Sequence, residues 1–409
     1  MIPKETIDKI FDSARIEEVV SDFVQLKKRG ANFIGNCPFH DEKTPSFTVS
    51  ASKGIYKCFG CGKGGNAVSF VMDHEHYSYP EALKYLAEKY NIEVVEKEMT
   101  AEQSIRVKDR DSLYVISAFG NKFFQEQLWE SKEGKTIGLS YFKERGFLEE
   151  TIKKFQLGYS PKQKDALSKV AINSSYKLKY LQDSGLSIVK NDTTLDRFRE
   201  RMMFPIHSFS GRVLGFGGRT LQKDNKAKYV NSPESLIYLK SKILYGIYFA
   251  KQEISKLNNC YIVEGYTDVI SLYQAGVQNV VSSSGTSLTT EQIKLINRFT
   301  KNITILFDGD AAGLKASFRS IDMILSEGMN VRVVLFPDGE DPDSFAKNST
   351  QEELMQYLQK NQQDFITFKT NVLSKDGEND PAKRVEMIKD IASSIAQIPD
   401  AISKSEYIK

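Results

Sequence analysis

The stretch ITILFDGDAAG, residues 303–313, places two aspartates directly after a run of apolar residues. The aliphatic and β-branched residues of 303–307 predict a buried β-strand. Asp308 and Asp310 follow at its carboxyl end, separated by Gly309. Functional side chains gather at the carboxyl ends of strands in open α/β sheets. The stretch therefore indicates a sheet of this type with a site at one edge.

The segments on either side of this strand alternate between strand and helix patterns. Short β-rich runs and helical patterns take turns from about residue 254 to residue 336, and this alternation implies a parallel sheet covered on both faces. The remaining residues, after Asp343, have helical patterns to the end of the chain. The expected strands are 260–264, 279–284, 303–308 and 331–336, and the expected helices between them are 268–276, 289–300 and 313–328.

Carboxylates also follow two other strands of this predicted sheet. Glu264 ends the first strand, and Asp341 and Asp343 follow the last one. Three strand ends thus deliver carboxylates toward one edge, where they raise each other's pKa unless cations neutralise them. Clustered carboxylate oxygens suit Mg²⁺ or Mn²⁺. Such ions activate an attacking hydroxyl and stabilise a leaving pyrophosphate.

A D-x-D motif after an apolar strand is compatible with several functions when it stands alone. Phosphotransferases with an aspartate nucleophile, sugar-nucleotide transferases and calcium loops all contain one. An EF-hand loop that began at Asp308 would need Glu at its twelfth position, where this chain has Arg319. The phosphotransferases normally carry their motif on the first strand of the domain, whereas here it follows the third. The triple acidic set is more specific than any of its members.

A second cluster of potential metal ligands lies near the N-terminus. Cys37, His40, Cys58 and Cys61 have the spacing C-x2-H-x17-C-x2-C. Two residues between ligands let both side chains of a knuckle point at one ion, and three sulfurs with one imidazole favour tetrahedral zinc over unligated buried cysteines. Because four protein ligands fill the tetrahedron, we expect one structural zinc rather than a catalytic one.

Basic and aromatic side chains surround these four ligands. Their interleaving suits single-stranded nucleic acid, through phosphate contacts and base stacking. The alternative is that the aromatic rings form a small core, which is the interpretation we favour for any single ring. The residues are Lys27, Lys28, Arg29, Lys43, Lys53, Lys57 and Lys63, with Phe33, Phe39, Phe47, Tyr56 and Phe59.

The net charge of +3 is unevenly distributed along the chain. The segment from Asp196 to Lys251 contains eleven Lys/Arg and four Asp/Glu, a local charge of +7, so the rest sums to about −4. A basic segment followed by acidic clusters is compatible with phosphate binding, and equally with a solvated basic surface. Within it, GRVLGFGGR (211–219) is expected to form a tight strand pair. His207 is expected to be structural, and Cys260 an inert buried thiol.

Length and composition set wider limits. A chain of 409 residues with 40% hydrophobic and 27% charged residues is expected to form two or more globular domains. The sequence contains no run of 18 apolar residues, so we expect no transmembrane helix. The N-terminal residues lack the apolar block of a signal peptide, so we expect a cytoplasmic protein. Clustered cysteines in such a chain favour metal binding over disulfides.

The motifs together resemble a known family. The elements E-G-Y-x-D, D-G-D-x-A-G and D-P-D are similar to the Toprim domain that primases, topoisomerases and some nucleases share. CPFHDEKTPSF and YKCFGCGKGGNAVSFVM resemble the zinc-binding domain of bacterial replicative primases. YFKERGF, FQLGYSP, DRFRERMMFPI, GFGGR, KYVNSPES and LYGI resemble their polymerase core. The resemblance extends, in order, over nearly the whole chain.

This resemblance implies roles for individual residues. Glu264, Asp308 and Asp310 match the catalytic, metal-binding acidic residues of the family, although Glu264 could instead be a general base. Asp341 and Asp343 match a further acidic pair at the same edge. The positions that match template- or nucleotide-binding residues are Arg145, Arg199, Arg201, Arg219, Lys228, Asn231 and Lys240.

The resulting hypothesis is a DNA-dependent RNA polymerase that makes short primers on single-stranded DNA from ribonucleoside triphosphates, with a monomeric core. The alternatives are a Toprim-type topoisomerase or nuclease, and a non-catalytic zinc-dependent module that binds single strands. We expect a multidomain α+β and α/β fold. Its parts would be a zinc-ribbon domain (1–97), a linker (98–111), a basic subdomain (112–250), a Toprim subdomain with a Rossmann-like parallel sheet (251–345) and a helical subdomain (346–409).

The chain departs from the family pattern at two places. Thr267 stands where E-G-Y-M-D is common, which changes a contact but no metal ligand. The family also continues into a C-terminal domain that binds the replicative helicase, whereas this sequence ends at SEYIK within what resembles the helical part of the core. Helicase binding is therefore not expected from these residues.

Overall fold

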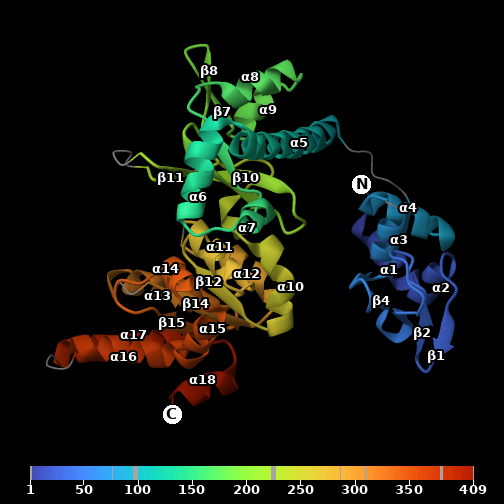
Figure 1. Cartoon of the computed structure of the whole chain (residues 1–409). Coiled ribbons are helices and arrows are strands. Elements are labelled where there is room, and N and C mark those ends of the chain that lie inside the picture. Colours follow the sequence, from blue (N-terminus) through green and yellow to red (C-terminus); the bar gives the residue numbers. More distant parts are fainter. Residues whose placement is uncertain are drawn as a thin grey trace. The chain divides into compact units, whose positions relative to one another are not determined.

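The computed structural model describes residues 2–75, 77–94, 100–222, 227–285, 287–308, 311–377 and 381–408. The chain forms two compact units, Met1–Arg106 and Val107–Lys409 (Figure 1). None of the described helices is long and apolar enough to cross a membrane.

The N-terminal unit combines a small antiparallel sheet with four helices. The five strands run in sequence order across the sheet. Its core contains the buried rings of Phe47, Tyr56 and Phe70. The elements are α1 (Lys4–Ser13), α2 (Ile16–Ser21), β1 (Lys27–Arg29), β2 (Asn32–Gly35), β3 (Phe47–Ser50), η1 (Ala51–Lys53), β4 (Ile55–Cys58), β5 (Gly64–Gly65), α3 (Ala67–Glu75) and α4 (Tyr79–Lys89).

The N-terminal residues form two short helices rather than one continuous helix. Ala14, at the end of α1, is extended. The backbone N–H of Arg15 donates to the hydroxyl of Tyr90, 3.2 Å away, instead of to a helical carbonyl. This break turns α2 so that Ile16, Val19 and Val20 are all buried. A tertiary contact thus overrides the local periodicity.

A long helix and a four-stranded antiparallel sheet organise the first half of the larger unit. The helix α5 (Ala101–Glu130) includes most of the predicted linker 98–111. Its Phe124 packs edge-on against Phe216 of the sheet, with ring centroids 5.3 Å apart. The sheet has the order β11-β10-β9-β6, from β6 (Gly158–Ser160), β9 (Arg201–His207), β10 (Val213–Thr220) and β11 (Tyr229–Asn231).

Shorter elements surround this sheet. A π-helical turn joins α5 to α6, and a separate two-stranded hairpin of β7 and β8 packs with α8 and α9. The elements are η2 (Gly134–Leu139), α6 (Ser140–Glu144), α7 (Glu149–Lys154), α8 (Ala166–Asn173), α9 (Leu178–Asp183), β7 (Ser187–Lys190), β8 (Thr193–Asp196), η3 (Lys240–Lys242) and α10 (Ile247–Leu257).

The segment GRVLGFGGR contains one strand, and the expected strand pair within it is wrong. β10 pairs with β9 on one side and with β11 on the other. Its glycines serve close packing rather than a turn. A Cβ at Gly217 would lie 2.5 Å from the ring of Tyr266, and one at Gly218 would lie 2.7 Å from Phe198.

The second half of the larger unit is built on a parallel sheet with the order β13-β12-β14-β15-β16. The first four strands are parallel, and the two-residue β16 pairs antiparallel at the edge. The elements are β12 (Cys260–Val263), α11 (Tyr266–Gln274), β13 (Val280–Ser282), α12 (Thr290–Asn297), β14 (Asn302–Phe307), α13 (Ala311–Ser326), β15 (Asn330–Leu335), α14 (Pro342–Asn348), α15 (Gln351–Lys360) and β16 (Gln363–Asp364).

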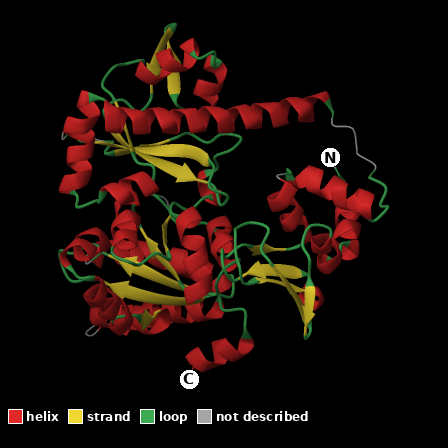
Figure 2. Ribbon diagram, turned by 45° about the vertical axis from the view of Figure 1, so that its right-hand side comes forward, coloured by secondary structure: helices red, strands yellow, loops and turns green. Residues whose placement is uncertain are grey.

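Helices cover both faces of the parallel sheet, as the sequence predicts (Figure 2). Tyr261 and Val263 pack on the face of α11, α14 and α15, whereas Cys260 and Ile262 pack on the face of α10, α12 and α13. The strands are therefore apolar on both sides, which is typical of a buried parallel sheet. The chain ends in α16 (Phe365–Gly377), α17 (Pro381–Ala396) and α18 (Ala401–Ile408), and α16 packs beside α17 (Figure 1).

Candidate metal centre and catalytic rim

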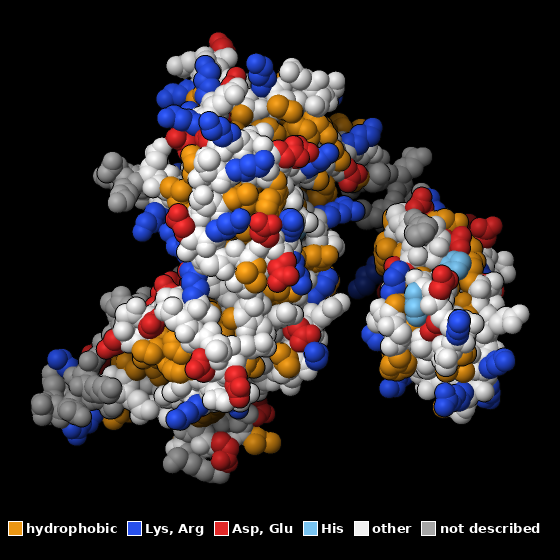
Figure 3. Space-filling model, in the orientation of Figure 1, with side chains coloured by type: hydrophobic (Ala, Val, Ile, Leu, Met, Phe, Trp, Pro, Cys, Tyr) orange, Lys and Arg blue, Asp and Glu red, His pale blue; other side chains and the backbone are white. Residues whose placement is uncertain are grey.

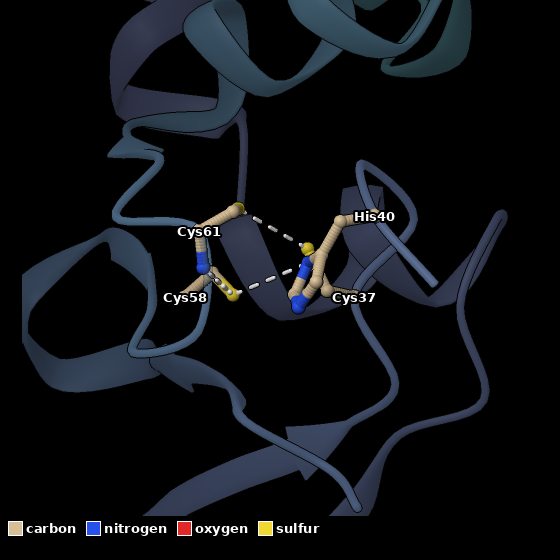
Figure 4. Close-up of side chains that lie close together, drawn as sticks. All are labelled: Cys37, His40, Cys58 and Cys61. Atoms are coloured by element: carbon tan, nitrogen blue, oxygen red, sulfur yellow. Dashed lines mark hydrogen bonds between the residues drawn. The ribbon is translucent and has the colours of Figure 1, made fainter. Parts of the chain in front are cut away.

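The four predicted zinc ligands converge in the N-terminal unit (Figure 4). One ligand atom from each of Cys37, His40, Cys58 and Cys61 lies within 4.8 Å of the others. The Sγ atoms of Cys37 and Cys61 are 3.8 Å apart, and Nδ1 of His40 lies 3.9 Å from Sγ of Cys58. Three sulfurs and one imidazole nitrogen around a common point fit structural zinc.

The sequence analysis missed the residues that hold these ligands in place. Nε2 of His40 lies 3.3 Å from a carboxylate oxygen of Glu42, so Nδ1 is left facing the sulfurs. Glu42 also accepts hydrogen bonds from the backbone N–H of Cys37 and of Ser46, at 2.7 and 3.0 Å. The hydroxyl of Ser46 lies 3.2 Å from Sγ of Cys58. Partners of this kind fix the orientation of ligands. Glu42 stands two positions after His40, which is the signal that the sequence offered.

The aromatic residues near the knuckles divide into core and surface. Phe47 and Tyr56 are fully buried and stack with centroids 5.2 Å apart. Phe39 packs beside them, and Lys63 lies over its ring at 4.4 Å. Phe59, between two zinc ligands, is 75% exposed. The core interpretation therefore holds for most of the rings, and Phe59 is the one whose face is open to solvent.

The carboxyl edge of the parallel sheet brings together Glu264 and Asp308. Glu264 follows β12 and is exposed, and Asp308 follows the neighbouring strand β14 and is half-buried. A cavity of about 350 Å³ lies at this edge, lined by Glu264, Ser283, Ser287 and the ends of both strands. Asp310, the second aspartate of the motif, lies outside the described residues. We call this edge the catalytic rim.

Asp343 is engaged in ion pairs that the sequence did not indicate. Its carboxylate accepts from Nη1 of Arg145 and from Nζ of Lys347, each at 2.7 Å, and from the hydroxyl of Ser271. The residue is only 6% exposed. Arg145, itself predicted to bind phosphate, lies directly after α6, so this pair joins the basic subdomain to α11 and α14.

Asp341 has a separate local role. It is the N-cap of α14, and its side chain accepts from the backbone N–H of Ser344 at 2.6 Å. Asp341 nevertheless remains exposed. The two aspartates of D-P-D therefore face different surroundings although one proline separates them.

Asp268 joins the rim without having been predicted. It lies in the first turn of α11 and accepts from the backbone N–H of Gly265 at 2.8 Å. Burial raises the pKa of Asp268 to about 7, and the charges of Asp343, Asp308 and Asp341 add to this effect. Its position four residues after Glu264, in the predicted helix, was the available signal.

The predicted phosphate-binding cations fall into two groups. The side chains of Arg199 and Lys228 are exposed. Arg201 is 7% exposed, and its Nη1 donates to the carbonyls of Gly218, Ala227 and Lys228. Burial lowers its pKa. Arg201 therefore fastens β9 to the strand beside it. In Figure 3, Lys and Arg side chains gather over the part of the larger unit that holds α6, β7 and β8.

Two further predicted residues line the junction between the antiparallel sheet and the rim. Arg219 lies over the rings of Tyr141 and Tyr229, each at 5.4 Å, and donates to the hydroxyl of Tyr229. Asn231 accepts from the hydroxyl of Tyr266 at 2.8 Å and donates to the carbonyl of Ser284 at 3.4 Å.

Lys240, the last of the predicted cations, is half-buried at the start of η3. Its ammonium group makes no hydrogen bond or ion pair with any residue that the structure describes. The backbone around it is held by α12 through Thr289 and Gln292.

Three family profiles match successive parts of the chain. The CHC2 zinc finger matches residues 2–102, the N-terminal domain of the DNA primase catalytic core matches residues 123–251, and a Toprim-like domain matches residues 261–346. Their order is the one that the motifs indicated. The resemblance and the predicted fold class are thereby confirmed.

Similar proteins and structures agree with these profiles. The DNA primase of Halalkalibacterium halodurans is 41% identical over 412 residues, which cover all of this chain and 68% of that protein. The crystal structure of the zinc-binding and RNA polymerase domains of the Aquifex aeolicus primase is 35% identical, with a TM-score of 0.65, and covers 98% of this chain and 94% of that one. A DnaG catalytic domain bound to single-stranded DNA is 32% identical, with a TM-score of 0.66, and covers 74% of this chain and 98% of that one.

Proposed function

Because the chain belongs to the DNA primase family, we propose that it copies single-stranded DNA into the short RNA primers from which DNA replication starts. The observation that carries this proposal is the meeting of Glu264 and Asp308 at neighbouring strand ends, beside a cavity and next to the basic subdomain. The substrates would be ribonucleoside triphosphates and a DNA template.

The rim fits a divalent cation by the chemistry of its donors. Glu264, Asp308 and Asp341 offer carboxylate oxygens. Hard oxygen donors of this kind suit Mg²⁺ or Mn²⁺. When bound, such an ion supplies Lewis-acid stabilisation of charge on the transferred phosphate. Glu264 is exposed at the cavity, so it is also placed to accept the proton of a primer hydroxyl.

The cations of the basic subdomain would bind phosphates. Arg199, Lys228 and Lys240 have side chains that are not committed to partners among the described residues, which leaves them available to template or nucleotide. Arg219 is half-buried and held between two tyrosine rings, and its planar guanidinium group would suit bidentate phosphate contact. Arg145 and Arg201, in contrast, would contribute by fixing the frame around these groups.

The zinc unit would contact the template. Phe59 offers an exposed ring for base stacking, and Lys57 and Lys63 lie on the same ribbon. Zinc held by the Cys₃His cluster would stabilise this small unit rather than take part in chemistry. A cytoplasmic location and a monomeric core complete the proposal.

The alternative functions are less well supported. A topoisomerase or nuclease would share the Toprim-like domain, but residues 123–251 match the primase core. A binding module without catalysis would leave the grouped carboxylates of the rim without a purpose.

A primer-synthesis assay tests the proposal. Wild-type protein is mixed with single-stranded template, four ribonucleotides and Mg²⁺, and products are separated on a denaturing gel. We expect short RNA whose appearance requires both the template and the ribonucleotides. Cleavage or relaxation of DNA without RNA synthesis would favour the Toprim alternatives, and template binding with neither activity would favour the binding module.

A further inference from the structure

The N-terminus of α12 is joined to the basic segment that carries Lys240. Thr289 and Gln292 form a reciprocal capping box: the side chain of Gln292 accepts from the backbone N–H of Thr289 at 3.0 Å, and Thr289 accepts from that of Gln292 at 3.2 Å. This arrangement satisfies two helix-terminal donors. It leaves the amide NH₂ of Gln292 and the hydroxyl hydrogen of Thr289 for other partners.

Those remaining donors all point to one backbone segment. Nε2 of Gln292 donates to the carbonyls of Lys240 and Ile243, at 3.2 and 2.7 Å. The hydroxyl of Thr289 donates to the carbonyl of Ser241 at 2.5 Å. Three carbonyls of the turn 240–243 are therefore held by two side chains of a different subdomain. Gln292 is 0% exposed, so a lost bond is not replaced by one to bulk water.

We call the hydrogen bonds from Thr289 and Gln292 to the turn 240–243 the bracket. It lies next to the catalytic rim. The residues that immediately precede Thr289 line the rim cavity together with Glu264, among them Ser283, Ser287 and Leu288. The antiparallel bridge between Tyr245 and Ser282 fastens the other side of the turn to β13. The backbone of Lys240 is thus fixed relative to the cavity wall, whereas its ammonium group has no hydrogen-bond or ion-pair partner within the described part of the chain.

We propose that Gln292 is a positioning residue that, by holding the 240–243 backbone, aims Lys240 at the triphosphate of the incoming nucleotide. The inference rests on the proposed function, and it deepens it by assigning Lys240 to nucleotide rather than template. The reason is proximity: the bracket adjoins the cavity at the acidic edge, where divalent cations bind nucleotide phosphates. Displacement of a phosphate ligand by about 1 Å is enough to weaken its contribution.

Two substitutions distinguish the loss of the hydrogen bonds to the 240–243 turn from the loss of the helix cap. Gln292→Glu keeps an acceptor for the N–H of Thr289, since Glu serves equally well in a capping box, but loses both donors to the carbonyls. Gln292→Met removes the acceptor and the donors. We expect both variants to raise KM for ribonucleotides about ten-fold in primer synthesis, with kcat within two-fold of wild type and template affinity unchanged.

A matched control uses another capping box of the same unit. Thr350 and Glu353 cap α15 in the same reciprocal way, and among the described residues their side chains bond to each other rather than to the basic segment. Glu353→Met therefore removes an equivalent cap without touching the 240–243 turn. KM for ribonucleotides should stay within two-fold of wild type. Unfolding of all variants is followed by the fluorescence of Trp129, the single tryptophan.

A double-mutant cycle decides whether Gln292 acts through Lys240. If it does, Gln292→Met should raise KM less than two-fold in a Lys240→Ala background, because the positioned group is already gone. Additive effects of the two changes, or a wild-type KM for Gln292→Glu with native folding, would overturn the proposal. A rise in template Kd in place of nucleotide KM would do the same.

The binding arm of the test remains informative if primer synthesis itself is absent. Equilibrium binding of Mg²⁺–GTP to the full chain, without template, is measured for wild type, Gln292→Glu and Lys240→Ala. Equal weakening in the two variants supports the positioning role independently of catalysis. Unweakened binding in both rejects it, even where the protein proves to be an active primase.

Discussion

The zinc cluster and the catalytic rim are both groups of ligand-type side chains, but they are assembled over different distances in the sequence. Cys37 and Cys61 are 24 positions apart, and their neighbours belong to the same small sheet. The ion pair at the rim joins Arg145 to Asp343 across 198 positions. Local spacing determines the first site, whereas the second depends on how two subdomains pack.

The sequence distance over which a site is assembled decides how far a motif reveals the role of each residue. All four knuckle residues meet at one point, because each short loop leaves them few alternatives. The acidic residues of the rim diverge: Glu264 is exposed, Asp341 caps a helix, and Asp343 is buried in ion pairs. Carboxylates that share a motif can thus serve different purposes.

Removal of zinc should produce the largest effect. Zinc binding contributes on the order of 10 kcal/mol to the folding of small domains of this kind. A chelator should therefore unfold the N-terminal unit, detected as fast hydrogen exchange throughout residues 2–94. The larger unit should remain folded, with unchanged fluorescence of Trp129. Slow exchange after complete zinc loss would show that the apolar core is sufficient, and loss of the Trp129 signal would show that the two units do not fold separately.

Substitution of Asp308 should have the next largest effect. Asp308→Asn keeps the size of the side chain but removes a charge at the rim, and we expect primer synthesis to fall about 10³-fold, equivalent to about 4 kcal/mol. Asp338→Asn, on the exposed loop after β15, is the matched control and should retain activity. Full activity of Asp308→Asn, at limiting as well as saturating Mg²⁺, would remove Asp308 from the proposed metal site.

The two aspartates of D-P-D should separate stability from catalysis. Asp343→Asn breaks the ion pairs with Arg145 and Lys347 and should destabilise the larger unit by about 3 kcal/mol. Asp341→Asn preserves the helix cap, since Asn caps as well as Asp, so stability should change by less than about 0.5 kcal/mol. Its effect should be a higher Mg²⁺ requirement for primer synthesis. Urea unfolding followed at Trp129 and Mg²⁺ titrations measure the two properties, and the reverse outcome would exchange the roles assigned here.

The sequence predicted the features that depend on short-range pattern. The parallel sheet, the helices on both of its faces and the zinc knuckles follow from periodicity and ligand spacing, and the structure contains them. The Thr289–Gln292 bracket and the pairing of Arg145 with Asp343 involve residues from separate subdomains, and no local pattern encodes them. Arg201 illustrates the limit: the family resemblance implied phosphate binding, and the structure adds hydrogen bonds to three backbone carbonyls that no local pattern encodes.

Two histidines extend the comparison to pH. His40 lies in the zinc cluster, and His207 lies in β9 of the larger unit, where it is buried with Nε2 3.1 Å from Oε1 of Gln156. Burial lowers the pKa of His207 to about 4. In the unfolded chain the imidazole of His207 has the ordinary pKa of about 6.5, so between pH 6.5 and 4 it binds a proton that it does not bind in the folded chain. Stability should therefore be lost as pH falls through this range.

The expected loss at His207 is about 3 kcal/mol between pH 7 and pH 4. His207→Phe removes the titrating group while keeping a ring to pack against Phe249. Between pH 7 and pH 4, the unfolding free energy of the wild type should fall by about 3 kcal/mol more than that of this variant. Fluorescence of Trp129 measures unfolding in both proteins. A constant difference would mean that the folded imidazole accepts a proton as readily as the unfolded one. At the zinc cluster the same pH change should act differently, because acid competes with zinc for the ligands and releases it.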